Sequence, residues 1–182
     1  MKKTLIGILY FEKGEPFNQQ KKYKSASKAR EEGMNMASAF YLNDYYLTKV
    51  YALTKRHLWA ILYGEIFVKP ESFSSRTQEV KRIVFESYKR LMAEINNITV
   101  DGKTYRYEDQ KDFKSASMKI YEGLLNVVND GIHTDNLMML RTRFLLEWNK
   151  YYALQYPSKL IGFQHQVIQK GHYKFYNHLA IL

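Results

Sequence analysis

The sequence contains no cysteine, which excludes disulfide bonds, thiolate metal ligands and a cysteine nucleophile. It also lacks any apolar run near the roughly 18 residues that a membrane-spanning helix needs. The missing disulfides favour the cytoplasm, or a particle assembled in the cytoplasm, as the location. With 182 residues, 46% of them hydrophobic and 25% charged, the chain is predicted to form a single domain over residues 1–182.

Acidic residues are missing from the last part of the chain, since none follows Glu147. Residues 1–30 carry eight Lys or Arg against two Glu, whereas residues 31–147 carry 16 basic and 16 acidic residues. The net charge of +10 therefore lies at the two ends of the sequence. If the ends meet, they form one positive face suited to nucleic acid, anionic lipid or an acidic protein. The alternative is a solvated basic surface without a dedicated partner.

The N-terminal apolar run, residues 4–11, is too short for a signal peptide and meets Glu12 and Lys13 without a small-residue cleavage site. We therefore predict no signal peptide. The run predicts a β-strand, and Gly and Pro near the start of residues 14–24 predict a loop after it. Residues 1–24 are thus expected to form a basic strand-and-loop arm.

Residues 37–67 contain eight of the 28 aromatic residues and few charges, so we expect this segment at the centre of the core. Its apolar spacing shifts phase around residues 55–57, which predicts two helices meeting at an angle there. Ser75 and Gln78 match a capping box and precede an apolar stripe, which predicts a helix over 75–96. Asp101-Gly102 between alternating apolar residues predicts a β-hairpin over 98–107 that pairs with the first strand.

Further helices are predicted after Asp112 and Thr134, each of which could serve as an N-cap. Residues 158–182 predict a basic helical hairpin divided at Gly171-His172. The fold class is therefore mostly α, as a helical bundle or stacked helical hairpins, with a minor β element. Turn-like sites at residues 43–45, 130–131 and 171–173 have a spacing that suits tetratricopeptide-type stacking, but the small residues and proline of that repeat are missing.

Three histidines, His165, His172 and His178, lie within 14 residues and could bind a metal. Gly171 interrupts their spacing and no carboxylate follows Glu147, so hydrogen-bonded or surface histidines are the preferred interpretation. No Gly-rich phosphate loop is present, and we predict no cofactor.

Asp101, Asp109 and Lys111 resemble the spacing of restriction-endonuclease-type metal-dependent nucleases. In that chemistry carboxylates hold a divalent ion and a lysine steadies the attacking water. The turn accounts fully for Asp101, so a nuclease is the third-ranked hypothesis.

Lysine outnumbers arginine by 20 to 8, which favours diffuse phosphate contact over planar base recognition. The candidate polyanion-binding residues are Lys21, Lys22, Lys24, Lys28, Arg30, Lys55, Arg56, Lys159, Lys170 and Lys174. Tyrosines among the basic residues could stack on bases, although such tyrosines more often border a core.

We expect a non-enzymatic structural, assembly or protein-interaction protein, for instance a component of a larger particle such as a phage assembly. Its partner would be another protein or copies of itself. The alternative is a nucleic-acid-binding protein that uses its basic ends, and salt dependence distinguishes the two.

Overall fold

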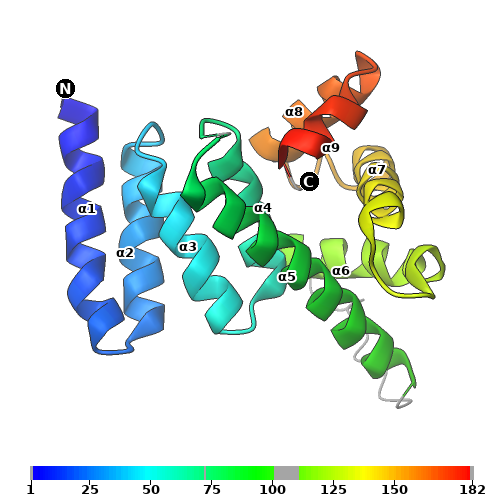
Figure 1. Cartoon of the computed structure of the whole chain (residues 1–182), viewed down its shortest axis with the longest axis horizontal. Coiled ribbons are helices and arrows are strands. Elements are labelled where there is room, and N and C mark those ends of the chain that lie inside the picture. The colour runs from blue at the N-terminus through cyan, green and yellow to red at the C-terminus, as the bar shows by residue number, and fades with distance from the viewer. Residues whose placement is uncertain (1, 72, 101–110, 181–182) are drawn as a thin grey trace. The chain divides into compact units, whose positions relative to one another are not determined.

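The computed structural model describes residues 2–71, 73–100 and 111–180, and the regular elements in these ranges are all helices. Figure 1 shows their order along the chain. The helices are α1 (Lys2–Gln19), α2 (Tyr23–Met36), α3 (Leu42–Leu53), α4 (His57–Val68), α5 (Ser75–Val100), α6 (Phe113–Gly123), the 3-10 helix η2 (Leu125–Val128), α7 (Thr134–Tyr151), α8 (Lys159–Gln169) and α9 (Tyr173–Ala180).

The helices form two compact units. The first unit ends at Ser87 and the second runs from Tyr88 to Ala180, so the boundary falls inside α5. The helical bundle predicted from the sequence is confirmed at this coarse level.

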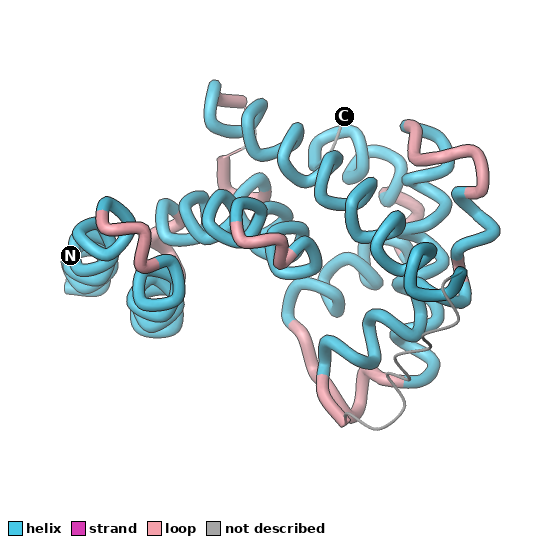
Figure 2. Tube along the Cα trace, turned by 90° about the horizontal axis from the view of Figure 1, so that it is seen from below, coloured by secondary structure: helices cyan, strands magenta, loops and turns pink. Residues whose placement is uncertain are grey.

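Two antiparallel helical hairpins, α1–α2 and α3–α4, make up most of the first unit (Figure 1). Lys21 and Lys55 close their turns with positive φ angles of 57° and 59°. In each turn the residue after the lysine donates its backbone N–H to the carbonyl oxygen five residues earlier. Lys22 donates to Phe17 O and Arg56 to Tyr51 O, both at 2.8 Å. This is the Schellman arrangement, which normally uses glycine. Because both hairpins run the same way, both turns lie at one end of the unit, facing the viewer in Figure 2.

Residues 37–67 supply much of the first unit's core, as their composition predicts. Leu47, Ala60 and Phe67 are fully buried, and Tyr51 packs with Leu47 and Ala60. The predicted change of direction around residues 55–57 is the α3–α4 turn.

The predicted N-terminal strand is wrong, because residues 4–11 belong to α1. Tertiary packing outweighs their β propensity. An added Cβ at Gly7 would lie 2.4 Å from Phe40 Cβ, so α1 approaches the segment before α3 too closely for any other residue without rearrangement. The predicted hairpin is not seen either: residues 98–100 are the end of α5, and residues 101–107 lie outside the described residues. Within the described ranges the structure contains no strand.

An aromatic cluster forms the core of the second unit. Trp148, 1% exposed, lies 4.7 Å from the ring of Phe113 and 5.7 Å from that of Phe144, measured between centroids. Phe144 stacks in turn on Tyr121 at 4.5 Å. The cluster joins α6 to α7.

The helix starts of the second unit are close to those predicted. The Asp112 side chain accepts the Ser115 N–H at 2.7 Å, which confirms the predicted N-cap of α6. The N-cap of α7 is His133, paired with Asn136 in a capping box, and not Thr134. The predicted C-terminal helix pair is present as α8 and α9, divided at Gly171 with a φ of 74°.

Candidate interaction surfaces

The outer face of α1 is apolar and exposed to solvent. Leu5, Ile8 and Leu9 are 59%, 39% and 60% exposed, and Glu12 next to them is also exposed. Their spacing of i, i+3, i+4 and i+7 places them on one side of the helix. We call these four residues the α1 outer face. Sequence patterns did not predict this face, because its apolar residues belong to the run at residues 4–11 that predicted a β-strand.

The opposite face of α1 is packed closely against the rest of the first unit. An added Cβ at Gly14 would lie 3.2 Å from Arg30 Cγ, and Asn43 donates from Nδ2 to the Gly7 carbonyl at 3.4 Å. Lys13 forms an exposed ion pair with Glu32 at 3.2 Å. These contacts fix α1 on α2 and α3, so that the outer face points away from the hairpin stack.

Arg30 does not belong to a polyanion-binding surface, because its side chain is fully buried. Its Nη2 donates to Glu15 Oε2 at 2.9 Å, and its guanidinium lies 5.0 Å from the centre of the Tyr46 ring and 5.7 Å from that of Phe11. Burial lowers the pKa of Arg30, and the carboxylate of Glu15 opposes that shift. The residue is a structural cation between α1, α2 and α3, which corrects its place in the candidate set.

The other basic candidates of the first unit gather at the end formed by the two hairpin turns. All are exposed, and we call them the basic turn surface: Lys21, Lys22, Lys24, Lys28, Lys55 and Arg56. Lys22 and Arg56 are the N-caps of α2 and α4, and neither helix has a side-chain cap or an acidic residue in its first turn. A cation there adds to the positive end of the helix dipole instead of compensating it. The charges of these side chains and the positive ends of the two helix dipoles therefore have the same sign at this surface.

One cation of this surface rests on an aromatic stack. The Arg56 guanidinium lies 5.8 Å from the centre of the Tyr51 ring, which stacks on Tyr63 at 5.5 Å. Both hydroxyls donate to Glu31 Oε1, at 2.5 and 3.1 Å. Burial and the Glu31 carboxylate raise the pKa of Tyr51 to about 12, so this hydroxyl stays a donor at neutral pH.

The three C-terminal candidates are exposed in the second unit: Lys159 on α8, Lys170 at the C-cap of α8 and Lys174 on α9. The proposal that the two basic ends of the chain form one face stays a prediction.

Metal-binding groups do not cluster in the part of the chain that the structure describes: no three His, Asp or Glu side chains are placed to share an ion. His165 is half-buried on α8, and His172 and His178 are exposed. Asp101 and Asp109 of the nuclease hypothesis lie outside the described residues, and Lys111 is exposed.

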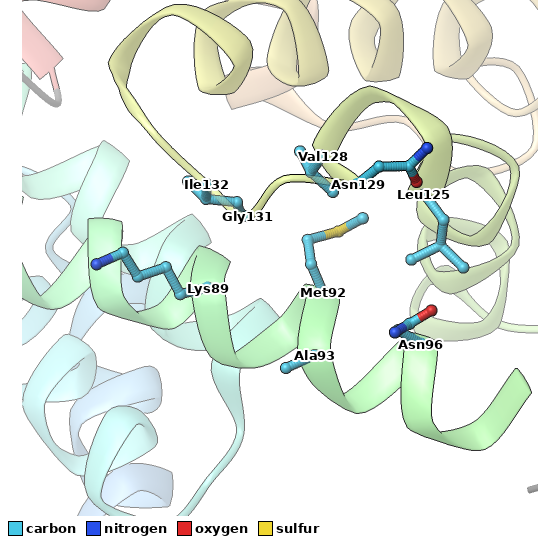
Figure 3. Close-up of a pocket in the computed structure, with 9 residues that line it drawn as sticks. All are labelled: Lys89, Met92, Ala93, Asn96, Leu125, Val128, Asn129, Gly131 and Ile132. Carbon is cyan, nitrogen blue, oxygen red and sulfur yellow. The ribbon is translucent and has the colours of Figure 1, made fainter. Parts of the chain in front are cut away.

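A pocket of about 480 Å³ lies in the second unit between α5 and the η2–α7 segment (Figure 3). Met92 and Val128 form part of its apolar wall, and the amides of Asn96 and Asn129 lie at its edge. Of the nine residues that line it, only Lys89 is titratable. The lining therefore mixes apolar and polar groups, and these nine residues offer no acid–base pair for catalysis.

No protein-family model, curated protein or solved structure matches this chain. Lys55 follows Lys21 by 34 residues, which is the length of a tetratricopeptide helical hairpin. This likeness concerns repeat length alone and assigns no family. Of the helices in the described ranges, none combines the length and apolarity needed to cross a bilayer.

Proposed function

We propose that this protein is a non-enzymatic interaction or assembly protein that docks a protein partner on the α1 outer face. The observation that carries the proposal is the exposure of Leu5 and Leu9, both near 60%, on a helix whose other face is closely packed. Stacked helical hairpins need a polar outer face at the end of the stack to stay soluble alone. A group of exposed apolar side chains at that position is typical of a surface that a partner covers.

Matched variants test the docking surface. Leu5→Gln/Leu9→Gln removes the apolar face, whereas Leu53→Gln changes one similarly exposed leucine of α3. Proteins retained by tagged wild-type chain from its native cells are identified by mass spectrometry, purified and titrated against each variant. We expect affinity to fall on the order of 100-fold or more for the double variant and to stay unchanged for Leu53→Gln. Equal affinity for all three chains would overturn the proposal.

A second candidate function is nucleic-acid binding by the basic turn surface. The observation that favours it is that Lys22 and Arg56 occupy the N-cap positions of α2 and α4 without capping them. This arrangement concentrates positive potential at one end of the unit. Phosphate contact by lysine is sequence-independent, so we expect weak sequence preference and steep salt dependence.

A salt series on a labelled oligonucleotide tests this candidate. Lys22→Glu is compared with Lys69→Glu, which makes the same charge change at the far end of α4. We expect the salt slope to fall by at least about one for Lys22→Glu and hardly at all for Lys69→Glu. Absence of binding at low salt would exclude the function, and equal effects of the two variants would exclude this surface.

A further inference from the structure

We infer that the basic turn surface binds the phosphate backbone of double-stranded nucleic acid, with Arg56 as a fixed contact and without stacking on bases. The inference deepens the second candidate function, on which it rests, because it names the form of the nucleic acid and the residue that positions it. The observations that carry it are the contacts of Arg56, Tyr51, Tyr63 and Glu31.

An aromatic ring holds the exposed side chain of Arg56 in place. The guanidinium lies 5.8 Å from the centre of the Tyr51 ring, which is the distance of a cation–π contact. The Arg56 backbone N–H also donates to Tyr51 O at 2.8 Å, so the main chain and the side chain of Arg56 are attached to the same residue. An arginine ordered in this way presents planar N–H groups that fit a phosphate, and it loses little rotamer freedom on binding.

The Tyr51 ring is itself fixed by the packing of three helices. It is 4% exposed and stacks on Tyr63 with an angle of 10° between the ring planes. Glu31 Oε1 accepts from both hydroxyls, at 2.5 Å from Tyr51 and 3.1 Å from Tyr63. The Glu31 charge opposes an anion at this surface, and the two hydroxyl donors offset part of it. Arg56 is therefore supported by α2, α3 and α4 together.

The same packing withdraws aromatic rings from this surface. Stacking on bases needs an exposed ring, but Tyr51 is buried and Tyr63 is half-buried. Phe17, Tyr23 and Trp59 lie next to the two turns in the sequence and are also half-buried. A single strand therefore gains little from unstacking its bases here, whereas a duplex carries about one negative charge per 1.7 Å of its axis. We expect the surface to prefer the duplex.

Titration with DNA and RNA oligonucleotides tests this preference. A labelled duplex of each kind is compared at low salt with one of its own strands. We expect at least one duplex to bind the wild-type chain several-fold more tightly than its strand does. Tighter binding of the single strands than of either duplex would overturn the inference, as would stronger binding to phosphatidylglycerol vesicles than to either duplex.

Exchanges that conserve charge test the role of Arg56. Arg56→Lys keeps the cation but loses the planar group that rests on the ring, so duplex affinity should fall about threefold to fivefold. Lys22→Arg is the matched control on the same surface and should not weaken binding. Because neither variant changes the number of cations, both should keep the salt slope of wild type. Equal affinity of the two variants would exclude Arg56 as the fixed contact.

Replacement of the ring tests the support of Arg56. Tyr51→Leu removes the cation–π contact without changing the charge and should lower duplex affinity by a factor similar to that of Arg56→Lys. Tyr51→Phe keeps the ring and should retain the affinity of wild type. Thermal unfolding shows whether either variant has lost its fold, and Arg56→Lys decides the matter if Tyr51→Leu has. Equal affinity of two folded Tyr51 variants would overturn the role of the ring.

The outcomes also separate this inference from the function on which it rests. If a single strand binds best and Lys22→Glu still lowers the salt slope, the basic turn surface binds nucleic acid and the inference is wrong. If no oligonucleotide binds at low salt, both are wrong.

Discussion

The helices of the two units differ at their N-termini. In the second unit Asp112 and Ser158 accept backbone N–H groups at the starts of α6 and α8, and His133 and Asn136 form a capping box at the start of α7. In the first unit α5 has a comparable start, where Ser74 Oγ accepts the Thr77 N–H at 3.2 Å. In the first unit α2, α3 and α4 have no side-chain cap, and Lys22 and Arg56 occupy the N-cap positions of α2 and α4. Since a cap contributes about 1 kcal/mol, the first unit gives up stability that the second retains.

Both interiors combine aromatic packing with buried polar side chains. The second unit packs Trp148 into an aromatic cluster and also buries Arg141 and Asn177, and the first buries Arg30, Asn43 and Asp44 between its hairpins. Asp44 Oδ1 has no hydrogen-bond partner among the described residues. Buried polar groups restrict the ways in which helices can pack, although they add little stability.

The largest predicted effect is that of Trp148→Ala. Removing this buried ring should lower the free energy of unfolding by about 4 kcal/mol, because it leaves a cavity at the centre of the aromatic cluster. Hydrogen exchange resolved along the chain should show the loss first in α6 and α7. Tyr151→Ala, at a 58% exposed neighbour, is the control and should change stability little. Equal losses would contradict the central place of Trp148.

Glu15→Ala is predicted to cost about 3 kcal/mol, because it leaves the fully buried guanidinium of Arg30 without its ion-pair partner. Arg30→Met should cost less, since it leaves a carboxylate whose side chain is already 32% exposed and can be hydrated. Urea denaturation of both variants checks the order. The reverse order would show that the desolvation of Arg30 is not the dominant cost.

Asp44 predicts a pH dependence specific to the first unit. Burial raises its pKa to about 7, so between pH 4 and 7 the unfolded chain ionises this group while the folded chain keeps it protonated. The free energy of unfolding of wild type should therefore fall relative to Asp44→Asn as pH rises, by an amount on the order of 4 kcal/mol. Urea denaturation at several pH values measures the difference, and a constant difference would contradict it.

Asp112 provides the control of opposite sign in the second unit. The Ser115 backbone N–H lowers the pKa of Asp112, so its stabilisation is present above the unfolded pKa and lost as pH falls through the folded one. Asp112→Asn should therefore approach wild type in stability only in acid.

The smallest predicted effects concern the helix starts. Lys22→Asp and Arg56→Asp should each stabilise the first unit by about 1 kcal/mol, because a carboxylate caps the helix and compensates its dipole. Asp112→Ala should destabilise the second unit by a similar amount. Thermal unfolding measures all three, and oligonucleotide binding should weaken in the two stabilised variants. If these two variants were more stable but bound the oligonucleotide as tightly as wild type, the missing caps would have no role in attracting anions.

Local signals predicted the second unit better than the first. Asp112 is an ordinary N-cap residue and Gly171 an ordinary turn residue. The start of α6 and the division between α8 and α9 could therefore be predicted from the sequence. Lys21 and Lys55 close left-handed turns without the glycine that marks such turns, which hid the 34-residue spacing. Asn43-Asp44, interpreted as a turn-like site, lies in the first turn of α3.

Tertiary context explains the remaining errors. Residues 4–11 belong to a helix that packs closely at Gly7, and the burial of Arg30 removed a basic residue from the surface. Neither effect leaves a periodic signal in the sequence. The exposure of the α1 outer face is likewise a property of packing, because an apolar run looks the same whether its outer side is covered or not.

The short turns at Lys21-Lys22 and Lys55-Arg56 also have a consequence for folding kinetics. Each joins two helices that lie side by side, so most contacts within a hairpin are between residues near in sequence. Little chain entropy is lost when such short loops close, and helical proteins rich in local contacts fold in microseconds to milliseconds. We therefore expect each hairpin to be an early folding unit, formed before α5 packs against α4.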